Sequence, residues 1–218
     1  MSQLIFKFPF KTSYFEKDFF VSSNNFEAYK LIESWPKWPD KKINIYGPKG
    51  SGKTHLINIL SKKLKLLSVN ANKFDGKINN LVKEYDCIVI ENYNENINEE
   101  LLYSLINHIS QFDKNLIINS QSNIKDFNIN LVDLKSRLSS FMEIQISLPT
   151  DDLIRVIISK SFSDKQIELS SKNLEFIIKN IERSYDKILK FTKDIDNLSL
   201  STGKSININL IKKVLPNE

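Results

Sequence analysis

The chain carries the run Gly47-Pro48-Lys49-Gly50-Ser51-Gly52-Lys53-Thr54, which fits the pattern G-x-x-x-x-G-K-[ST] of a phosphate-binding loop. An apolar run at residues 43–46 precedes it, and apolar residues at helical spacing follow over 55–64. The pattern is meaningful in this strand–loop–helix setting. We therefore predict that backbone N–H groups of the loop wrap phosphates, aided by the positive N-terminal end of the following helix.

Two side chains of this loop have predicted roles of their own. Lys53 is expected to reach the β- and γ-phosphates, and the hydroxyl of Thr54 is expected to bind Mg²⁺. The chain is thus predicted to bind a nucleoside phosphate. The other residues expected to contact the nucleotide here are Gly47, Pro48, Lys49, Gly50, Ser51, Gly52 and His55.

Apolar residues from position 43 to position 146 alternate between short runs and helical stretches. Such alternation predicts an α/β fold, in which a five-stranded parallel sheet is flanked by helices. Residues 26–35 are predicted to form a helix before the sheet, and residues 1–19 an extended tail. The expected strands are 43–46, 66–69, 87–90, 116–119 and 144–146, and the expected helices between them are 55–64, 78–85, 99–111 and 130–138.

The sequence changes character at Pro149, which ends the last predicted strand. Thr150 or Asp151 can cap the helix that follows. Beyond this point only helices are predicted, so residues 20–148 are expected to form a nucleotide-binding domain and residues 149–218 a small all-helical lid. The lid helices are expected at 152–162, 171–180, 184–200 and 207–215.

Composition excludes several classes of protein. The chain has 218 residues, of which 41% are hydrophobic and 26% charged, as in ordinary globular proteins. No apolar stretch reaches the roughly 18 residues of a membrane span, and the N-terminus lacks a signal-peptide pattern. The single cysteine, Cys87, allows no internal disulfide and suits the reducing cytoplasm. We therefore expect a cytoplasmic protein without a membrane partner.

The net charge of +5 raises the question of nucleic-acid binding. Lysines are spread along the chain rather than clustered, which favours weak nonspecific attraction over sequence-specific DNA binding. Neither His55 nor His108 has partners at metal-ligand spacing, so neither is expected to bind a metal.

A P-loop site needs a second acid for Mg²⁺, placed at the end of a later strand. The run at 87–90 ends in Glu91, which is the predicted acid, and the next residue is Asn92. An amide is a poor general base because it does not accept a proton from water at neutral pH. Glu95 is an alternative base, although its spacing gives it no advantage. Weak intrinsic hydrolysis is therefore expected.

Four further residues have polar side chains where a nucleotide site could use them. Asn119 and Ser120 end a predicted strand, where they either hydrogen-bond the γ-phosphate or form an ordinary turn. Arg137 precedes the last strand and is a candidate for a phosphate in a neighbouring subunit, where a planar guanidinium stabilises transition-state charge. Arg183 is a similar candidate from the lid side.

The order of these features resembles the AAA+ family. Within it, residues 45–56 and the run Asp133-Leu134-Lys135-Ser136-Arg137-Leu138 are most similar to the bacterial replication initiators of the DnaA type and to their shorter homologues, the Hda-type regulatory inactivators of DnaA. The resemblance covers about residues 20–215. DnaA proteins carry a helix-turn-helix domain after the lid, whereas this sequence stops at Glu218, so an Hda-type protein is expected.

The resemblance implies partners and roles. Gln3, Leu4 and Phe6 resemble the short peptide with which Hda proteins dock on the DNA polymerase III sliding clamp. Arg137 is implied to be an arginine finger presented in trans to DnaA, and Arg183 the lid arginine that senses nucleotide. The protein's own nucleotide is then a conformational ligand, ADP or ATP with Mg²⁺. The resemblance leaves open whether the protein also forms a homodimer.

Three alternatives remain open at this point. A self-sufficient AAA+ ATPase such as a helicase loader would need a working acid beside Glu91 and, commonly, a partner-binding extension. A small-molecule P-loop kinase would need an arginine-rich lid, which this arginine-poor chain does not offer. A noncatalytic clamp-binding adaptor would use the P-loop only for structure. Hydrolysis of DnaA-bound ATP in the presence of Arg137→Ala distinguishes this adaptor from an inactivator, because only the inactivator needs Arg137.

Overall fold

The structure, a computed structural model, describes residues 19–215. They form two compact units, one up to Ser147 and one from Leu148 onward. The first unit is built on a five-stranded parallel sheet with the strand order β2-β3-β4-β1-β5. The predicted fold class is confirmed. The strands are β1 (Lys42–Tyr46), β2 (Leu66–Asn70), β3 (Cys87–Tyr93), β4 (Asn115–Ser120) and β5 (Met142–Gln145).

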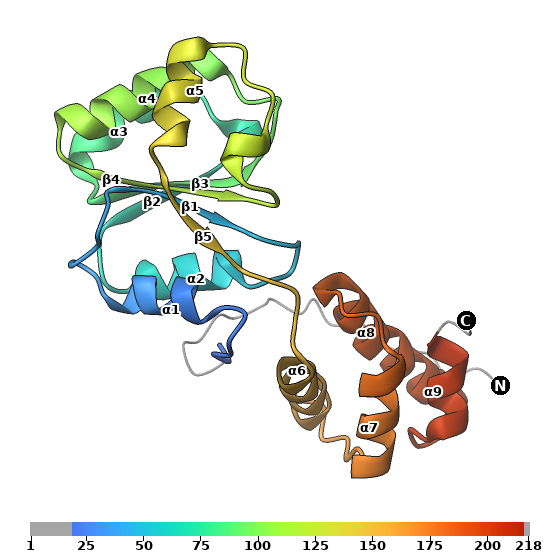
Figure 1. The fold of residues 1–218 in the computed structure, drawn as a ribbon. Helices are drawn as coiled ribbons and strands as arrows, with labels where there is room; N and C mark the ends of the chain where they lie inside the picture. Colours follow the sequence, from blue (N-terminus) through green and yellow to red (C-terminus); the bar gives the residue numbers. More distant parts are fainter. Residues whose placement is uncertain (1–18, 216–218) are drawn as a thin grey trace. The chain divides into compact units, whose positions relative to one another are not determined.

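Helices cover both faces of this sheet (Figure 1). On one face lie α1 (Phe26–Glu33) and α2 (Lys53–Leu60); on the other lie α3 (Lys77–Leu81), α4 (Glu99–Gln111) and α5 (Val132–Ser139). Short 3₁₀ turns at Ala71–Lys73, Val82–Glu84 and Ile124–Asp126 complete the connections.

The alternation of side chains along each strand explains how the sheet carries two cores. In β3, Cys87 and Val89 pack toward α1 and α2, whereas Ile88 and Ile90 pack toward α4 and α5. All four are buried, and burying an aliphatic side chain such as Ile88 contributes about 1.5–3 kcal/mol. The polar residues that follow each apolar run therefore gather at one edge of the sheet, the carboxyl edge, because the strands are parallel.

The second unit contains only helices among its described residues: α6 (Asp151–Ser163), α7 (Ser171–Asn180), α8 (Tyr185–Thr202) and α9 (Ile208–Val214). Of the two predicted caps of α6, Thr150 is the one observed, since its Oγ1 accepts from Leu153 N at 3.3 Å. Ser170 Oγ caps α7 in the same way, accepting from Asn173 N at 3.3 Å. The apolar stripe of α8 joins the core of this unit through Ile188 and other residues.

Several predicted boundaries differ from the observed ones. The helix after the phosphate loop ends at Leu60 instead of residue 64, because the chain turns at Ser61, whose hydroxyl donates to Asn58 O. The last strand is displaced toward the N-terminus, from 144–146 to Met142–Gln145. β3 continues past its apolar run to Tyr93, with a shift in register between Ile90 and Tyr93.

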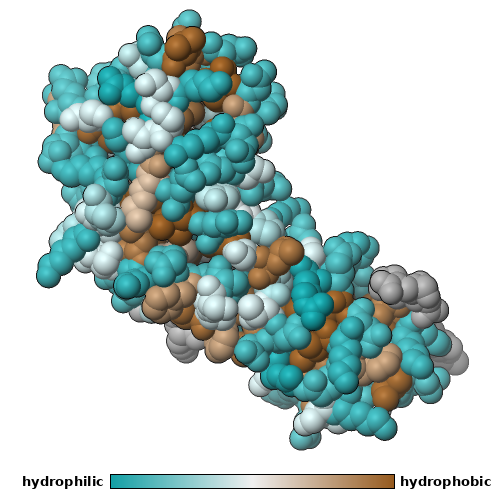
Figure 2. Space-filling model, viewed as in Figure 1, coloured by the Kyte–Doolittle hydropathy of each residue, from teal (hydrophilic) through white to brown (hydrophobic). Residues whose placement is uncertain are grey.

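Polar side chains cover most of the visible surface of each unit, with apolar ones in small patches between them (Figure 2). Within residues 19–215, no helix combines the length and apolar character needed to cross a bilayer.

Candidate nucleotide-binding site

The predicted phosphate loop connects β1 to α2 and depends on glycine geometry. Gly47, Gly50 and Gly52 have φ values of 155°, 82° and 95°. A Cβ on Gly47 would lie 2.3 Å from the carbonyl oxygen of Ile146, and one on Gly52 would lie 2.9 Å from Cε2 of Phe19. The loop therefore packs too closely for a side chain at Gly47, where the obstacle is backbone, whereas a side chain at Gly52 would displace the Phe19 ring. It turns directly into the N-terminus of α2, where backbone N–H groups are free to bind an anion.

Lys53 folds back over this loop. Its ammonium group donates to Gly47 O at 2.7 Å and Pro48 O at 3.0 Å, and it lies 3.4 Å from Ser51 Oγ. Burial lowers the pKa of Lys53 from its ordinary value to about 8. Burial penalises an ammonium that no anion neutralises, and phosphate oxygens would supply the missing negative charge. This donor set and loop fit a nucleotide phosphate chain.

Thr54 and Glu91, the residues predicted for Mg²⁺, lie together. Thr54 Oγ1 donates to Glu91 Oε2 at 2.6 Å, which links the start of α2 to the end of β3. No group of three His, Cys, Asp or Glu side chains among the described residues could hold a metal ion without other ligands. Mg²⁺ commonly combines one or two protein oxygens with phosphate oxygens and water, so this pair fits that ion beside a nucleotide.

The two polar residues at the end of β4 have side chains on opposite faces of the sheet. Ser120 Oγ accepts a hydrogen bond from Asn44 Nδ2 at 2.9 Å, so its hydroxyl has a structural partner. Asn119 points to the opposite face, the one that carries α2, and is 1% exposed. Neither Oδ1 nor Nδ2 of Asn119 has a hydrogen-bond partner among residues 19–215. A buried amide without partners at this edge is consistent with a polar ligand, as predicted for Asn119.

Asn44 is a buried site residue that sequence reasoning missed. Its Nδ2 donates to Ile118 O and Ser120 Oγ, both at 2.9 Å, and its Oδ1 accepts from Ile124 N at 3.1 Å. These bonds fix the end of β4 beside β1. The available signal was a single amide between two isoleucines in an otherwise apolar strand.

Phe19 is a second residue that the sequence did not single out. Its ring makes an edge contact with His55 at 5.3 Å between centroids and stacks on Tyr29 at 5.8 Å. Because its Cε2 also approaches Gly52, Phe19 lies against the start of α2. His55 was predicted to contact the nucleotide, and the structure gives it an aromatic neighbour on that side. Sequence reasoning had assigned Phe19 to the tail.

Arg137 lies on the exposed side of α5, and within the described residues its guanidinium has no carboxylate partner. Arg183 lies between α7 and α8, where its Nη2 pairs with Asp151 Oδ1 at 2.9 Å and its Nε donates to the same oxygen at 3.1 Å. Both groups of this pair are more than half exposed, so the pair contributes little to stability. Gln3, Leu4 and Phe6 fall outside the described residues.

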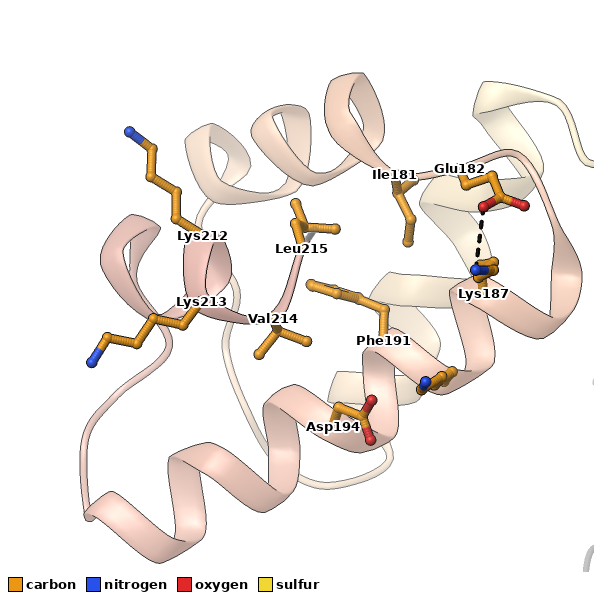
Figure 3. A pocket seen from close by; sticks show the side chains of 10 residues that line it. Ile181, Glu182, Lys187, Phe191, Asp194, Lys212, Lys213, Val214 and Leu215 are labelled. Atoms are coloured by element: carbon orange, nitrogen blue, oxygen red, sulfur yellow. Dashed lines mark ion pairs between the residues drawn. The ribbon is translucent and has the colours of Figure 1, made fainter. Parts of the chain in front are cut away.

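The helical unit contains a hollow that the sequence did not predict. It has a volume of about 680 Å³. Figure 3 shows Ile181, Phe191 and Leu215 pointing into it and the ammonium ends of Lys212 and Lys213 pointing away. Because the apolar side chains belong to the core of this unit, the hollow is an indentation of that core. Its lining residues are Ile181, Glu182, Lys187, Lys190, Phe191, Asp194, Lys212, Lys213, Val214 and Leu215.

Comparison with known proteins places this geometry in context. No protein-family profile matches the chain. The chromosomal replication initiator protein DnaA of Borrelia garinii subsp. bavariensis is 28% identical over 246 residues, a match that spans 96% of this chain and 49% of that protein. The chain thus spans about half the length of the curated relative.

Solved structures show the same fold. Domain III of the Thermotoga maritima replication initiation protein DnaA matches with a TM-score of 0.76 at 20% identity, over 95% of this chain and 98% of that one. The AMPPCP-bound DnaA from Aquifex aeolicus matches with a TM-score of 0.70 at 18% identity, over 86% of this chain and 66% of that one.

The parallel sheet, the P-loop and the helical unit that follows give this chain the fold of DnaA domain III. The sequence similarity is to replication initiators over nearly the whole chain. The chain is thus similar to replication initiators of the DnaA type in sequence and in fold.

Proposed function

We propose that the protein binds ADP or ATP with Mg²⁺ and restrains chromosomal replication initiation by stimulating hydrolysis of the ATP bound to DnaA. The observation that carries this proposal is the state of Arg137. The chain has three arginines; Arg155 and Arg183 each pair with a carboxylate, whereas Arg137 is exposed and has no such partner among the described residues. A guanidinium in this state is available to a phosphate of another molecule.

The segment before α5 supports this role by fixing the helix that carries Arg137. The carboxylate of Glu99, at the start of α4, accepts from Asn130 N at 3.0 Å and Leu131 N at 2.7 Å. These backbone N–H groups hold the pKa of Glu99 below its ordinary value. Because α5 is tied to α4, the guanidinium projects from an ordered helix. A preorganised arginine stabilises charge on a transferring phosphoryl group without first being ordered.

In this proposal the protein's own nucleotide acts as a conformational ligand. Glu91 and Thr54 supply the oxygen atoms for Mg²⁺, but the residue beside Glu91 is Asn92, an amide. Without rapid turnover, the bound nucleotide, ADP or ATP, can hold the protein in one conformation. Arg183 is proposed to respond to that nucleotide from the lid, and the small energetic value of its pair with Asp151 leaves it free to exchange partners.

Docking on the DNA-loaded sliding clamp is proposed from the N-terminal sequence. Gln3, Leu4 and Phe6 would place one polar and two apolar side chains on the clamp. Attachment to a loaded clamp would restrict the stimulation of DnaA to chromosomes whose replication machinery has been assembled.

A second candidate is favoured by the sequence relatives, which are themselves initiators. Under this reading the protein is a self-sufficient AAA+ ATPase that acts in initiation, as an initiator module or a helicase loader. Arg137 would then serve a neighbouring copy of the same chain, and the protein would hydrolyse its own ATP.

Hydrolysis of DnaA-bound ATP, measured with DNA-loaded clamp, tests the first candidate. The intact chain is compared with Arg137→Ala and with Lys135→Ala, a matched loss of one exposed positive charge on α5. We expect the intact chain and Lys135→Ala to stimulate hydrolysis, and Arg137→Ala to lose about 10³-fold of that stimulation. A variant with alanine at Gln3, Leu4 and Phe6 should lose only that part of the stimulation of hydrolysis that depends on the clamp.

Two results would contradict the proposal. Equal stimulation by Arg137→Ala would reject the arginine finger and leave a noncatalytic clamp-binding adaptor. No stimulation by the intact chain, with active DnaA and clamp, together with rapid hydrolysis of its own ATP, would support the second candidate.

A further inference from the structure

Both carboxylate oxygens of Glu91 are held by hydroxyl groups. Thr54 Oγ1, at the start of α2, donates to Oε2 at 2.6 Å. Ser68 Oγ, on β2, donates to Oε1 at 2.6 Å. Three separate elements, α2, β2 and β3, therefore meet at one side chain. The bond from Ser68 crosses between adjacent strands, because Ser68 lies opposite Val89, two residues before Glu91.

The second hydroxyl matters because of the length of a glutamate side chain. Glu91 has one more rotatable bond than an aspartate would have, so its carboxylate can occupy more positions around the end of β3. A donor on one oxygen restricts those positions. Since a carboxylate offers about four acceptor sites, the bonds from Thr54 and Ser68 leave capacity for the water molecules of a bound cation.

We propose that Ser68 is a positioning residue of the Mg²⁺ site, which holds Glu91 so that its other oxygen faces Thr54. This inference rests on the proposed binding of nucleotide with Mg²⁺ at the P-loop. Ser68 itself touches neither the nucleotide nor the metal. Its hydroxyl orients the carboxylate, in the way that residues behind metal ligands commonly do.

Ser68 is exposed, which separates this role from a contribution to the core. Loss of one exposed hydroxyl on a strand should change the stability of the free protein little. Loss of an outer partner of a metal ligand, by contrast, typically weakens metal affinity 10- to 100-fold. The expected effect is therefore on the Mg²⁺ dependence of nucleotide binding and not on the fold.

Calorimetric titration of ADP into the full chain, at a series of Mg²⁺ concentrations and in EDTA, tests this proposal. We expect Ser68→Ala to raise the Mg²⁺ concentration for half-maximal enhancement of ADP binding by about tenfold or more, with ADP affinity in EDTA unchanged. Ser68→Thr, which keeps the hydroxyl on a residue suited to a strand, should behave like the parent.

Two controls sharpen the result. Ser61→Ala removes a hydroxyl that bonds only to the backbone of α2, and it should leave the Mg²⁺ dependence unchanged. The double variant Ser68→Ala/Glu91→Gln should be no worse than Glu91→Gln alone, because Ser68 acts through Glu91.

The possible failures can be told apart. If Ser68→Ala keeps the parent's Mg²⁺ dependence, the positioning role is rejected while nucleotide binding stands. If Ser68→Ala weakens ADP binding equally in EDTA, Ser68 acts on the loop and the positioning role is again rejected. If the parent binds no ADP with or without Mg²⁺, the proposed nucleotide binding is itself rejected, and the role of Ser68 falls with it.

Discussion

The ammonium group of Lys53 donates a hydrogen bond to the backbone carbonyl oxygen of Gly47 across 2.7 Å. Burial has lowered the pKa of this group to about 8. A bound phosphate chain would stabilise the charged form, so the pKa should be higher in the complex than in the free protein. Between these two pKa values, binding of nucleotide must take up a proton.

We therefore expect ADP affinity to fall as the pH rises from about 8 toward 10. Titration calorimetry near pH 8.5, in buffers with different ionisation enthalpies, should show net proton uptake. Lys53→Arg keeps a positive charge that does not titrate in this range, so any remaining binding should lose that uptake. An affinity that is independent of pH in the parent would contradict the assignment of Lys53 to the phosphates.

The glycines of the chain give a second prediction. A Cβ on Gly47 would meet the Ile146 carbonyl oxygen at 2.3 Å, whereas a Cβ on Gly203 would meet nothing within 4 Å. Gly203 ends α8 with a φ of 63°, so Gly203→Ala carries only the backbone penalty of about 1 kcal/mol. Gly47→Ala should lose more in free energy of unfolding and also abolish ADP binding. Urea denaturation measures the free energy of unfolding, and calorimetry measures ADP binding. Equal losses of stability in Gly47→Ala and Gly203→Ala would contradict the close contact between Gly47 and Ile146.

Much of the fold was predictable because it depends on local patterns. The alternation of strand and helix signals predicted the parallel sheet. The predicted bounds of α4, 99–111, match the observed ones, and in the structure Asn98 caps its N-terminus by accepting from Leu101 N at 3.0 Å. The phosphate loop was predictable for the same reason, since its chemistry lies in consecutive residues. Thr54 and Glu91 were both predicted to bind Mg²⁺, and the structure places them within hydrogen-bonding distance of each other.

The contacts that were missed depend on register and on distant packing. The separation of Asn119 from Ser120 requires knowing that Asn44 lies opposite the end of β4. The bond from Ser68 to Glu91 requires the register of β2 against β3. Phe19 precedes the first helix, and nothing in its neighbours predicts its position against α2. Sequence periodicity fixes which face a side chain takes, but not which partner lies beside it.

Asn119 and Asn44 offer a contrast between two buried amides. Asn44 has three hydrogen bonds, and Asn119 has none among residues 19–215. Asn119→Leu should therefore keep or raise the free energy of unfolding, by up to about 1–3 kcal/mol, because it removes unpaired polar atoms. Asn44→Leu should lower it by a similar amount. Thermal and urea unfolding measure both.

The same Asn119→Leu variant should discriminate less well between ATP and ADP, if Asn119 contacts the γ-phosphate or the water beside it. Binding of ADP and of AMPPCP, measured for parent and variant, tests this point. An Asn119→Leu protein that is less stable than the parent, with unchanged nucleotide preference, would mean that Asn119 has a structural role.

Asn92 gives a final prediction about catalysis. It follows Glu91, is exposed, and has a φ of 56°, in a left-handed region where Asn and Asp are both enriched. The parent should hydrolyse ATP more slowly than about one turnover per second.

Asn92→Asp supplies a proton acceptor beside the metal ligand, and general base catalysis is typically worth 10²- to 10⁴-fold. A rise of about 10²-fold in steady-state hydrolysis is therefore expected. Asn96→Asp, which adds the same charge at another exposed position of the following loop, is the matched control and should have no such effect. Rapid hydrolysis by the parent would instead mean that another group, with Glu95 the nearest candidate along the chain, already serves as the base, and it would favour a self-sufficient ATPase.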